Sequence, residues 1–149
     1  MTATKSTAPA GFSAEEVAAM KERAREAKAA ARRRSGADKG DGLADLQAKI
    51  ADMPEPDRSM AKRIHEIVMA SVPELEPKTY YGMPAYAKDG RTICFFKPAS
   101  KFKMRYATLG FQPDAKLDDG TMWPTEFALL DLSAANQARI AELVQRASS

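Results

Sequence analysis

The sequence predicts an α+β domain in which a single antiparallel sheet of about five strands is flanked by N-terminal and C-terminal helices. Two observations predict this fold class. Apolar residues recur at helical spacing from about residue 43 to residue 72 and again after Ser133, whereas they alternate with other residues from about residue 78 to residue 130. Turn sequences interrupt the alternating segment, and strands joined by short turns pair antiparallel. Helices on both sides of such strands are typical of α+β domains.

The chain of 149 residues divides into four segments. Residues 1–12 are rich in Thr, Ala, Ser and Pro and are expected to form a disordered tail. Residues 13–34 are expected to form an appended amphipathic helix, and residues 35–42, SGADKGDG, a polar, Gly-rich linker. Residues 43–149 are expected to form the domain, and the chain length leaves room for only one.

Composition and charge narrow the classes of function. A hydrophobic fraction of 44% is ordinary for a chain that buries a core, and a net charge of +3 gives no strong nucleic-acid signal. There is no apolar run of membrane-spanning length, no apolar core of a secretory signal at the start, and only one cysteine. We therefore expect a cytoplasmic protein without a membrane partner, whose state as monomer or homo-oligomer stays open.

The appended helix has clear start signals. Ser13 is placed to cap it, and Glu16, three residues later, completes a capping box. The run of arginines from Arg32 to Arg34 suits the negative end of the helix dipole better than a nucleic-acid contact, because Glu22 and Glu26 share the helix. Its apolar stripe comprises Val17, Met20, Ala24, Ala27 and Ala31. Since these side chains are mostly small, we expect the helix to pack weakly on the domain or on a partner.

Three helices of the domain follow from apolar spacing and from capping residues. One is expected before Pro54, one from Asp57 to Val72, and one after the N-cap Ser133. Their expected inner faces are Leu43, Leu46, Ile50 and Met53; Met60, Ile64, Ile67, Val68 and Val72; and Ile140, Leu143, Val144 and Ala147.

The first strands are expected on either side of a hairpin turn. A strand over residues 79–83 would bend at Met83-Pro84 on an edge of the sheet. Asp89-Gly90 is a typical type I′ pair and would join the next two strands, the second of which covers residues 91–97.

Two more strands are expected towards the C-terminus. Alternation predicts one over residues 102–108 and another over residues 123–129, separated by the turn LDDGT at residues 117–121. Trp123 begins the apolar face of the last strand, so we expect it to anchor the core.

The segment from Lys78 to Leu130 contains the run Tyr80-Tyr81-Gly82-Met83-Pro84, most of the aromatic residues, the one Cys and the one Trp. In these features the chain resembles the YdhG-like domain family, small bacterial proteins of which some are labelled frataxin-like intracellular iron chaperones. The resemblance covers roughly Leu43 to the C-terminus. It implies an α+β fold and a protein that handles iron or a small ligand. Many relatives carry a histidine near the loop where this chain has Lys101-Phe102-Lys103, so no role of that histidine transfers.

Two groups of residues are candidates for ligand binding. Tyr80, Tyr81 and Met83 form either one wall of a shallow pocket or simply a strand that bends over the core. Lys103 and Arg105 would project from one strand face, as an anion-binding platform or as a solvated surface.

A weak iron site would use carboxylates, because iron in a chaperone is held by hard oxygen ligands. The candidates in the late loop are Asp114, Asp118 and Asp119, although the last two are also adequately explained as a turn. The earlier carboxylates, Asp45, Asp52, Glu55 and Asp57, are interleaved with Lys49, Arg58, Lys62 and Arg63, which repel a cation.

The sequence contains no catalytic motif. His65 is the only histidine and is expected on a helix, at the boundary between core and surface, with an ordinary hydrogen bond. Cys94 lies between apolar residues and is expected to be buried and inert. These features favour a non-enzymatic protein. The expected function is a metal-handling or small-ligand accessory protein, and the alternative is a protein-interaction module that uses the N-terminal helix.

Overall fold

The computed structural model describes residues 13–34 and 41–149, so the predicted tail and most of the predicted linker lie outside it. The described residues form four helices and one five-stranded antiparallel sheet with the strand order β1-β2-β3-β4-β5. The α+β class with helices flanking one sheet is therefore confirmed. The elements are α1 (Ala14–Arg34), α2 (Asp41–Ala51), α3 (Asp57–Ser71), β1 (Glu76–Tyr80), β2 (Met83–Lys88), β3 (Arg91–Lys97), β4 (Ala107–Phe111), β5 (Glu126–Leu129) and α4 (Ala134–Ala147).

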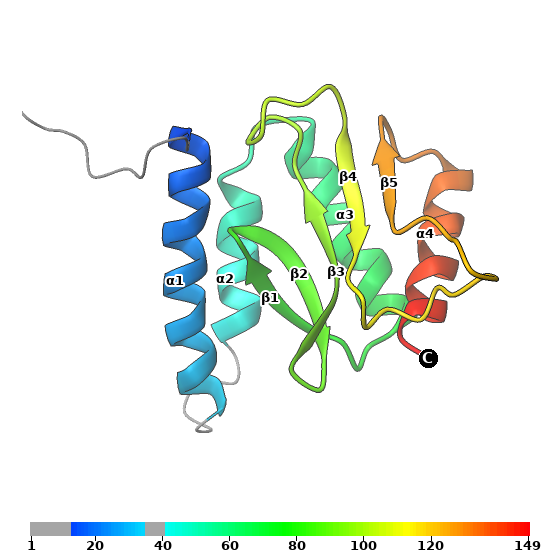
Figure 1. Cartoon of the computed structure of the whole chain (residues 1–149). Coiled ribbons are helices and arrows are strands. Elements are labelled where there is room, and N and C mark those ends of the chain that lie inside the picture. The colour runs from blue at the N-terminus through cyan, green and yellow to red at the C-terminus, as the bar shows by residue number, and fades with distance from the viewer. Residues whose placement is uncertain (1–12, 35–40) are drawn as a thin grey trace, which may run out of the picture.

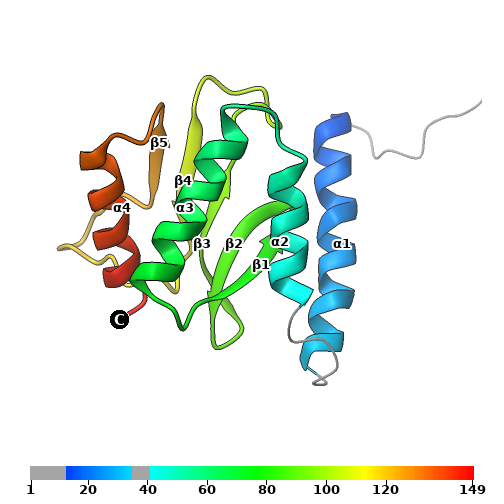
Figure 2. The same cartoon turned by 180° about the vertical axis from the view of Figure 1, so that it is seen from behind.

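Helices α2, α3 and α4 cover one face of the sheet, and α1 stands beside α2 near the β1 end (Figures 1 and 2). The main core lies between the three helices and the sheet. The expected inner faces of the helices are buried, except that Leu43 is exposed and Val72 is half-buried. Among the described residues, no helix has the length and apolar character needed to cross a membrane.

Capping residues begin α1 and α4 as predicted. The Ser13 hydroxyl accepts the backbone N–H of Glu16 at 3.1 Å, and the Glu16 carboxylate accepts the backbone N–H of Ser13 at 2.8 Å. Ser133 in the same way accepts the backbone N–H of Asn136 at 3.2 Å. The side chains of Arg32, Arg33 and Arg34 lie outside the part of the chain that the structure describes.

The β1–β2 hairpin differs from the prediction. The next hairpin, between β2 and β3, agrees with it: Asp89 and Gly90 have positive φ angles of 52° and 81°, as a type I′ turn requires. Tyr81 and Gly82 also have positive φ angles, 50° and 77°, and they form a second tight hairpin turn that divides the expected first strand. Pro84 consequently lies on β2, which pairs with both β1 and β3, so the prediction of a sheet edge at Met83-Pro84 is wrong.

The predicted strand over residues 102–108 is also wrong, because β4 begins only at Ala107. The preceding residues form a loop that the buried carboxylate of Asp57 holds on the start of α3. This carboxylate accepts the backbone N–H groups of Ala99 at 3.3 Å and Ser100 at 2.9 Å, and also the hydroxyl of Ser100. These hydrogen bonds stabilise turns in place of strand pairing.

The last strand is shorter than expected. β5 begins at Glu126, so Trp123 precedes it and does not belong to the strand. Trp123 is half-buried and packs against the main core. The positive φ of 70° at Gly120 fits the predicted turn at LDDGT.

A smaller apolar cluster covers the opposite face of the sheet. Met83, Ala85 and Phe95 are buried there, with Tyr80, Tyr81 and Phe102 packed against them. A side chain at Gly110 would collide with the Phe95 ring, so the ring lies directly over this glycine of β4.

Candidate carboxylate-binding site

The turn between β1 and β2 presents two adjacent backbone N–H groups. Tyr81 is a bulky residue at a positive φ, and such conformations cost about 1–3 kcal/mol. The ring of Tyr81 meets the ring of Tyr80 edge-on, with 4.7 Å between centroids, and Tyr80 in turn contacts Phe95. Successive N–H groups in a turn form a concave site for an anion.

The carboxylate of Glu26, on α1, fills this turn. Its two oxygens accept the backbone N–H groups of Tyr81 and Gly82, each at 2.8 Å. Glu26 is only 8% exposed. Because a buried carboxylate is costly unless it is hydrogen-bonded, these two charge-assisted bonds account for its burial.

Lysines surround the turn. The ammonium of Lys101 donates to the backbone carbonyl of Tyr81 at 3.4 Å, and the ammonium of Lys49 pairs with the carboxylate of Glu22 at 2.6 Å. Burial, and then the charge of Lys49, lower the pKa of Lys101. Burial opposes ionisation of Glu22, but the hydrogen bond and the charge of Lys49, together with the charges of Arg25 and Lys101, outweigh it, so the pKa of Glu22 is lowered.

A third ion pair lies nearer the start of α1. The ammonium of Lys103 contacts the carboxylate of Glu15 at 2.8 Å. The hydrogen bond from Lys103 lowers the pKa of Glu15, and the same bond raises the pKa of Lys103. Lys103 belongs to the loop before β4 and has a positive φ of 55°.

Helix α1 therefore docks through an acidic face. Glu15, Glu22 and Glu26 are spaced by seven and four residues, which places them on one side of a helix. The described part of the expected apolar stripe is mostly turned away from the contact: Met20, Ala24 and Ala27 are exposed and Val17 is half-buried, while the side chain of Ala31 lies outside the described residues. Small side chains gain little by burial, whereas the carboxylates meet cations and backbone N–H groups.

We use "carboxylate site" for the domain's side of this contact: the backbone N–H groups of Tyr81 and Gly82 with the ammonium groups of Lys49, Lys101 and Lys103. Arg23 of α1 adds a cationic contact to it. Its guanidinium carbon lies 5.9 Å from the Tyr80 ring centroid and 5.7 Å from that of Tyr81.

Four of the five candidate ligand-binding residues lie at or beside the carboxylate site. Tyr80, Tyr81 and Met83 belong to the turn and its cluster, and Lys103 contacts α1. Arg105 instead lies over the Tyr106 ring, 5.2 Å from its centroid. The expectation that Lys103 and Arg105 share a strand face is wrong, because neither lies in a strand. Sequence reasoning missed Glu26. The signal that could have found it is the spacing of Glu15, Glu22 and Glu26, which places the three carboxylates on one side of the helix.

The proposed metal carboxylates do not form a cluster. Asp114 pairs with Arg91 at 3.2 Å, and Asp118 and Asp119 lie exposed before the turn at Gly120. Within residues 13–34 and 41–149 as far as their side chains are described, no group of three or more His, Cys, Asp or Glu is placed to hold a metal ion.

The single histidine and the single cysteine have structural partners. His65 is half-buried, with its Nδ1 2.9 Å from the Tyr86 hydroxyl, and burial lowers its pKa. Cys94 is fully buried, and burial raises its pKa to about 12, which removes the reactive thiolate. Both findings agree with the expectations from sequence.

Comparison with known proteins identifies no relative. No protein-family model, no curated protein and no solved structure gives a match to this chain. The resemblance to the YdhG-like family consequently remains an expectation from the sequence.

Proposed function

We propose that this protein is a non-enzymatic binding module whose carboxylate site recognises an acidic helix of a partner protein. In this proposal α1 is the resident occupant of the site. One observation carries the proposal: Glu26 is buried with both carboxylate oxygens on consecutive backbone N–H groups of a strained turn. Strained turns of this kind persist where the surroundings hold them, and they often occur at binding sites.

The chemistry of the partner follows from α1. Its three glutamates meet Lys103, Lys49 and the Tyr81–Gly82 turn in order along the helix. Carboxylates eleven residues apart on a helix are separated by about 16 Å along its axis. The site therefore favours a helix with acidic side chains at this spacing over a compact small acid, which can reach only one of the three positions.

Metal handling is less well supported. It requires several oxygen ligands around one ion, and the side chains that the structure describes gather no such group. The alternative from the sequence was a protein-interaction module that uses the N-terminal helix. The present proposal differs in that α1 occupies the site that an acidic helix of a partner would take.

The test uses the full chain with Glu26→Ala, which empties the turn, and a synthetic peptide of residues 13–34. The peptide should shift the amide NMR signals of Tyr81 and Gly82 in a saturable manner. A matched peptide with Glu26→Gln should bind about tenfold more weakly, the equivalent of about 1.4 kcal/mol for a lost charge-assisted hydrogen bond. Equal binding of the two peptides, or no shift at Tyr81 and Gly82, would refute the proposal.

A further inference from the structure

Two tyrosine rings stand beside the turn of the carboxylate site. The rings of Tyr80 and Tyr81 meet edge-on, with 4.7 Å between their centroids and 82° between their planes. Both side chains are half-buried, and the Tyr80 ring also contacts Phe95 of the smaller apolar cluster. The rings are therefore anchored in the domain, and together they offer aromatic faces next to the turn. We call them the tyrosine pair.

The guanidinium of Arg23, on α1, lies over both rings. Its carbon is 5.9 Å from the Tyr80 centroid and 5.7 Å from the Tyr81 centroid. Both distances are within the range of about 6 Å in which an aromatic face attracts a cation. Within the part of the chain that the structure describes, no carboxylate pairs with Arg23, so its contacts are with the tyrosine pair.

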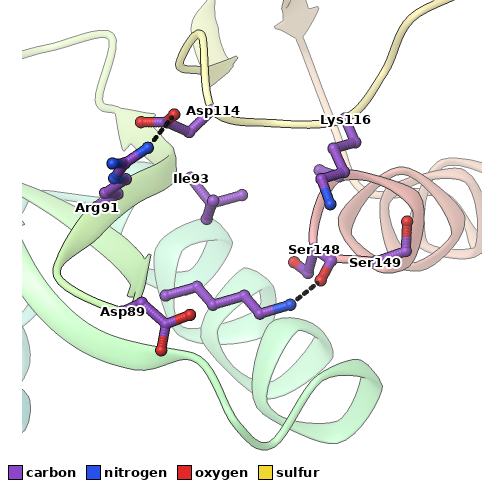
Figure 3. A pocket seen from close by; sticks show the side chains of 9 residues that line it. Asp89, Arg91, Ile93, Asp114, Lys116, Ser148 and Ser149 are labelled. Atoms are coloured by element: carbon purple, nitrogen blue, oxygen red, sulfur yellow. Dashed lines mark hydrogen bonds and ion pairs between the residues drawn. The ribbon is translucent and has the colours of Figure 1, made fainter.

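Other arginines of the domain contact carboxylates instead. Arg91 is an example, at the pocket between the β2–β3 hairpin and the end of α4, where its guanidinium lies 3.2 Å from the Asp114 carboxylate (Figure 3). Arg58 and Arg63 each pair with a glutamate three residues away. Aromatic faces, and not a counter-charge, therefore account for the position of Arg23.

Simple charge attraction disfavours a positive residue on the docked helix. The domain presents the ammonium groups of Lys49, Lys101 and Lys103 to α1, and like charges repel. An uncharged residue at position 23 would avoid this repulsion. The attraction of the ring faces opposes it, and a guanidinium suits these faces better than an ammonium, because it is planar, more weakly hydrated and able to stack on a ring.

We propose that the partner helix carries an arginine three residues before the glutamate that enters the turn, in an Arg-x-x-Glu sequence like that of Arg23 and Glu26. This inference rests on the proposed function, since it names a second group that the same site recognises. Residues three apart lie on one side of a helix. The glutamate accordingly accepts the N–H groups of Tyr81 and Gly82 while the arginine lies over the tyrosine pair. The site thereby distinguishes such a helix from one that is only acidic.

The test titrates peptides of residues 13–34 into the full chain with Glu26→Ala and follows the Tyr81 and Gly82 amides by NMR. Arg23→Gln in the peptide should raise the Kd about two- to fivefold, the equivalent of about 0.5–1 kcal/mol for an exposed cation–π contact. Lys21→Gln is the matched control, since Lys21 is exposed, lies two residues away and loses the same charge. Its Kd should be unchanged or lower. Both changes make the peptide more acidic, so attraction to the lysines alone would lower both Kd values.

Two further variants examine the contact itself. Arg23→Lys in the peptide keeps the charge and should recover only part of the affinity that Arg23→Gln loses. Tyr80→Leu in the domain removes one ring, so the effect of Arg23→Gln should become smaller on this chain, as a double-mutant cycle measures. If the Tyr80→Leu chain does not fold, the peptide series on the Glu26→Ala chain decides alone.

Equal Kd values for the unaltered and Arg23→Gln peptides, or a lower Kd for Arg23→Gln, would overturn the inference. Arg23→Lys binding as tightly as the unaltered peptide would overturn the choice of arginine. In both cases the proposed function would still stand, provided that Glu26→Gln weakens the peptide. If no peptide shifts the Tyr81 and Gly82 amides, the proposed function fails and the inference fails with it.

Discussion

Glu26 and Gly82 are 56 residues apart in the chain and are joined by a 2.8 Å hydrogen bond from the Gly82 backbone N–H to the Glu26 carboxylate. Through this bond and its neighbour from Tyr81, α1 is attached to the tip of the β1–β2 hairpin. Asp57 accepts two consecutive backbone N–H groups in the same way and holds the loop before β4. That loop supplies Lys101 and Lys103, so two buried carboxylates together build the contact with α1.

Glu26→Ala should release α1 from the turn without unfolding the domain. Loss of a hydrogen bond to a charged group corresponds to about 1.5–3 kcal/mol, so hydrogen exchange of the Tyr81 and Gly82 amides should accelerate roughly 10- to 100-fold. Glu74→Ala is the control, since Glu74 is exposed and outside α1. Unchanged exchange at Tyr81 and Gly82 would show that Glu26 does not hold the turn.

Gly82→Ala and Gly90→Ala form a matched pair that separates steric fit from backbone strain. Both glycines have positive φ, and alanine at such positions destabilises by more than about 0.4–1 kcal/mol. A Cβ at Gly90 meets nothing within 4 Å, whereas one at Gly82 collides with the Lys101 ammonium and contacts the Glu22 side chain at 3.4 Å. Gly82→Ala should therefore weaken α1 docking, read from the Tyr81 amide, while Gly90→Ala should not. Equal effects on docking would contradict the tight fit.

The docking of α1 should be lost in acid. The docked carboxylates of Glu15 and Glu22 have pKa values below the ordinary 4.5, so they stay ionised more readily docked than free. Their contribution to docking is fully present above pH 4.5 and declines as the pH falls towards the docked pKa values. The amide signal of Gly82 should move towards its undocked position below that pH, while that of Gly90 reports only the domain. A Gly82 signal that does not move as the pH falls from 7 to about 3 would contradict this.

Gly110→Ala should destabilise the domain by about 1–3 kcal/mol, because the new methyl group overpacks the Phe95 ring. Denaturant unfolding measures this change. A second substitution, Phe95→Leu, removes the obstructing ring atoms and should recover part of the loss. If Phe95→Leu adds its own full cost to that of Gly110→Ala, the two residues are not in contact as described.

The parts of the fold that were predictable depend on local signals. Ser133 has its capping role and Asp89-Gly90 its hairpin turn because neighbouring residues alone determine both. The turn at Tyr81-Gly82 was not predictable in the same way, since a tyrosine at positive φ needs tertiary contacts to hold it. The loop at residues 99–106 likewise depends on Asp57, more than forty residues earlier.

The candidate site shows the same limit. Tyr80, Tyr81 and Met83 stood out in the sequence, but nothing local assigned a carboxylate to them. Glu26 lies 55 residues before Tyr81, and its role follows only when α1 is placed beside the hairpin. The apolar stripe of α1 suggested the opposite face for docking. Hydrophobic spacing carries no information about where cations and backbone N–H groups lie, so it could not indicate the acidic face.

A competition measurement tests the central claim most directly. The peptide of residues 13–34 is titrated into the unaltered full chain and into the Glu26→Ala chain, with the Gly82 amide as the readout. Because the site is accessible only in the fraction of molecules with α1 released, the apparent Kd should be higher for the unaltered chain, by about tenfold or more. Equal Kd values for the two chains would contradict the account, since α1 would then not occupy the site that binds the peptide.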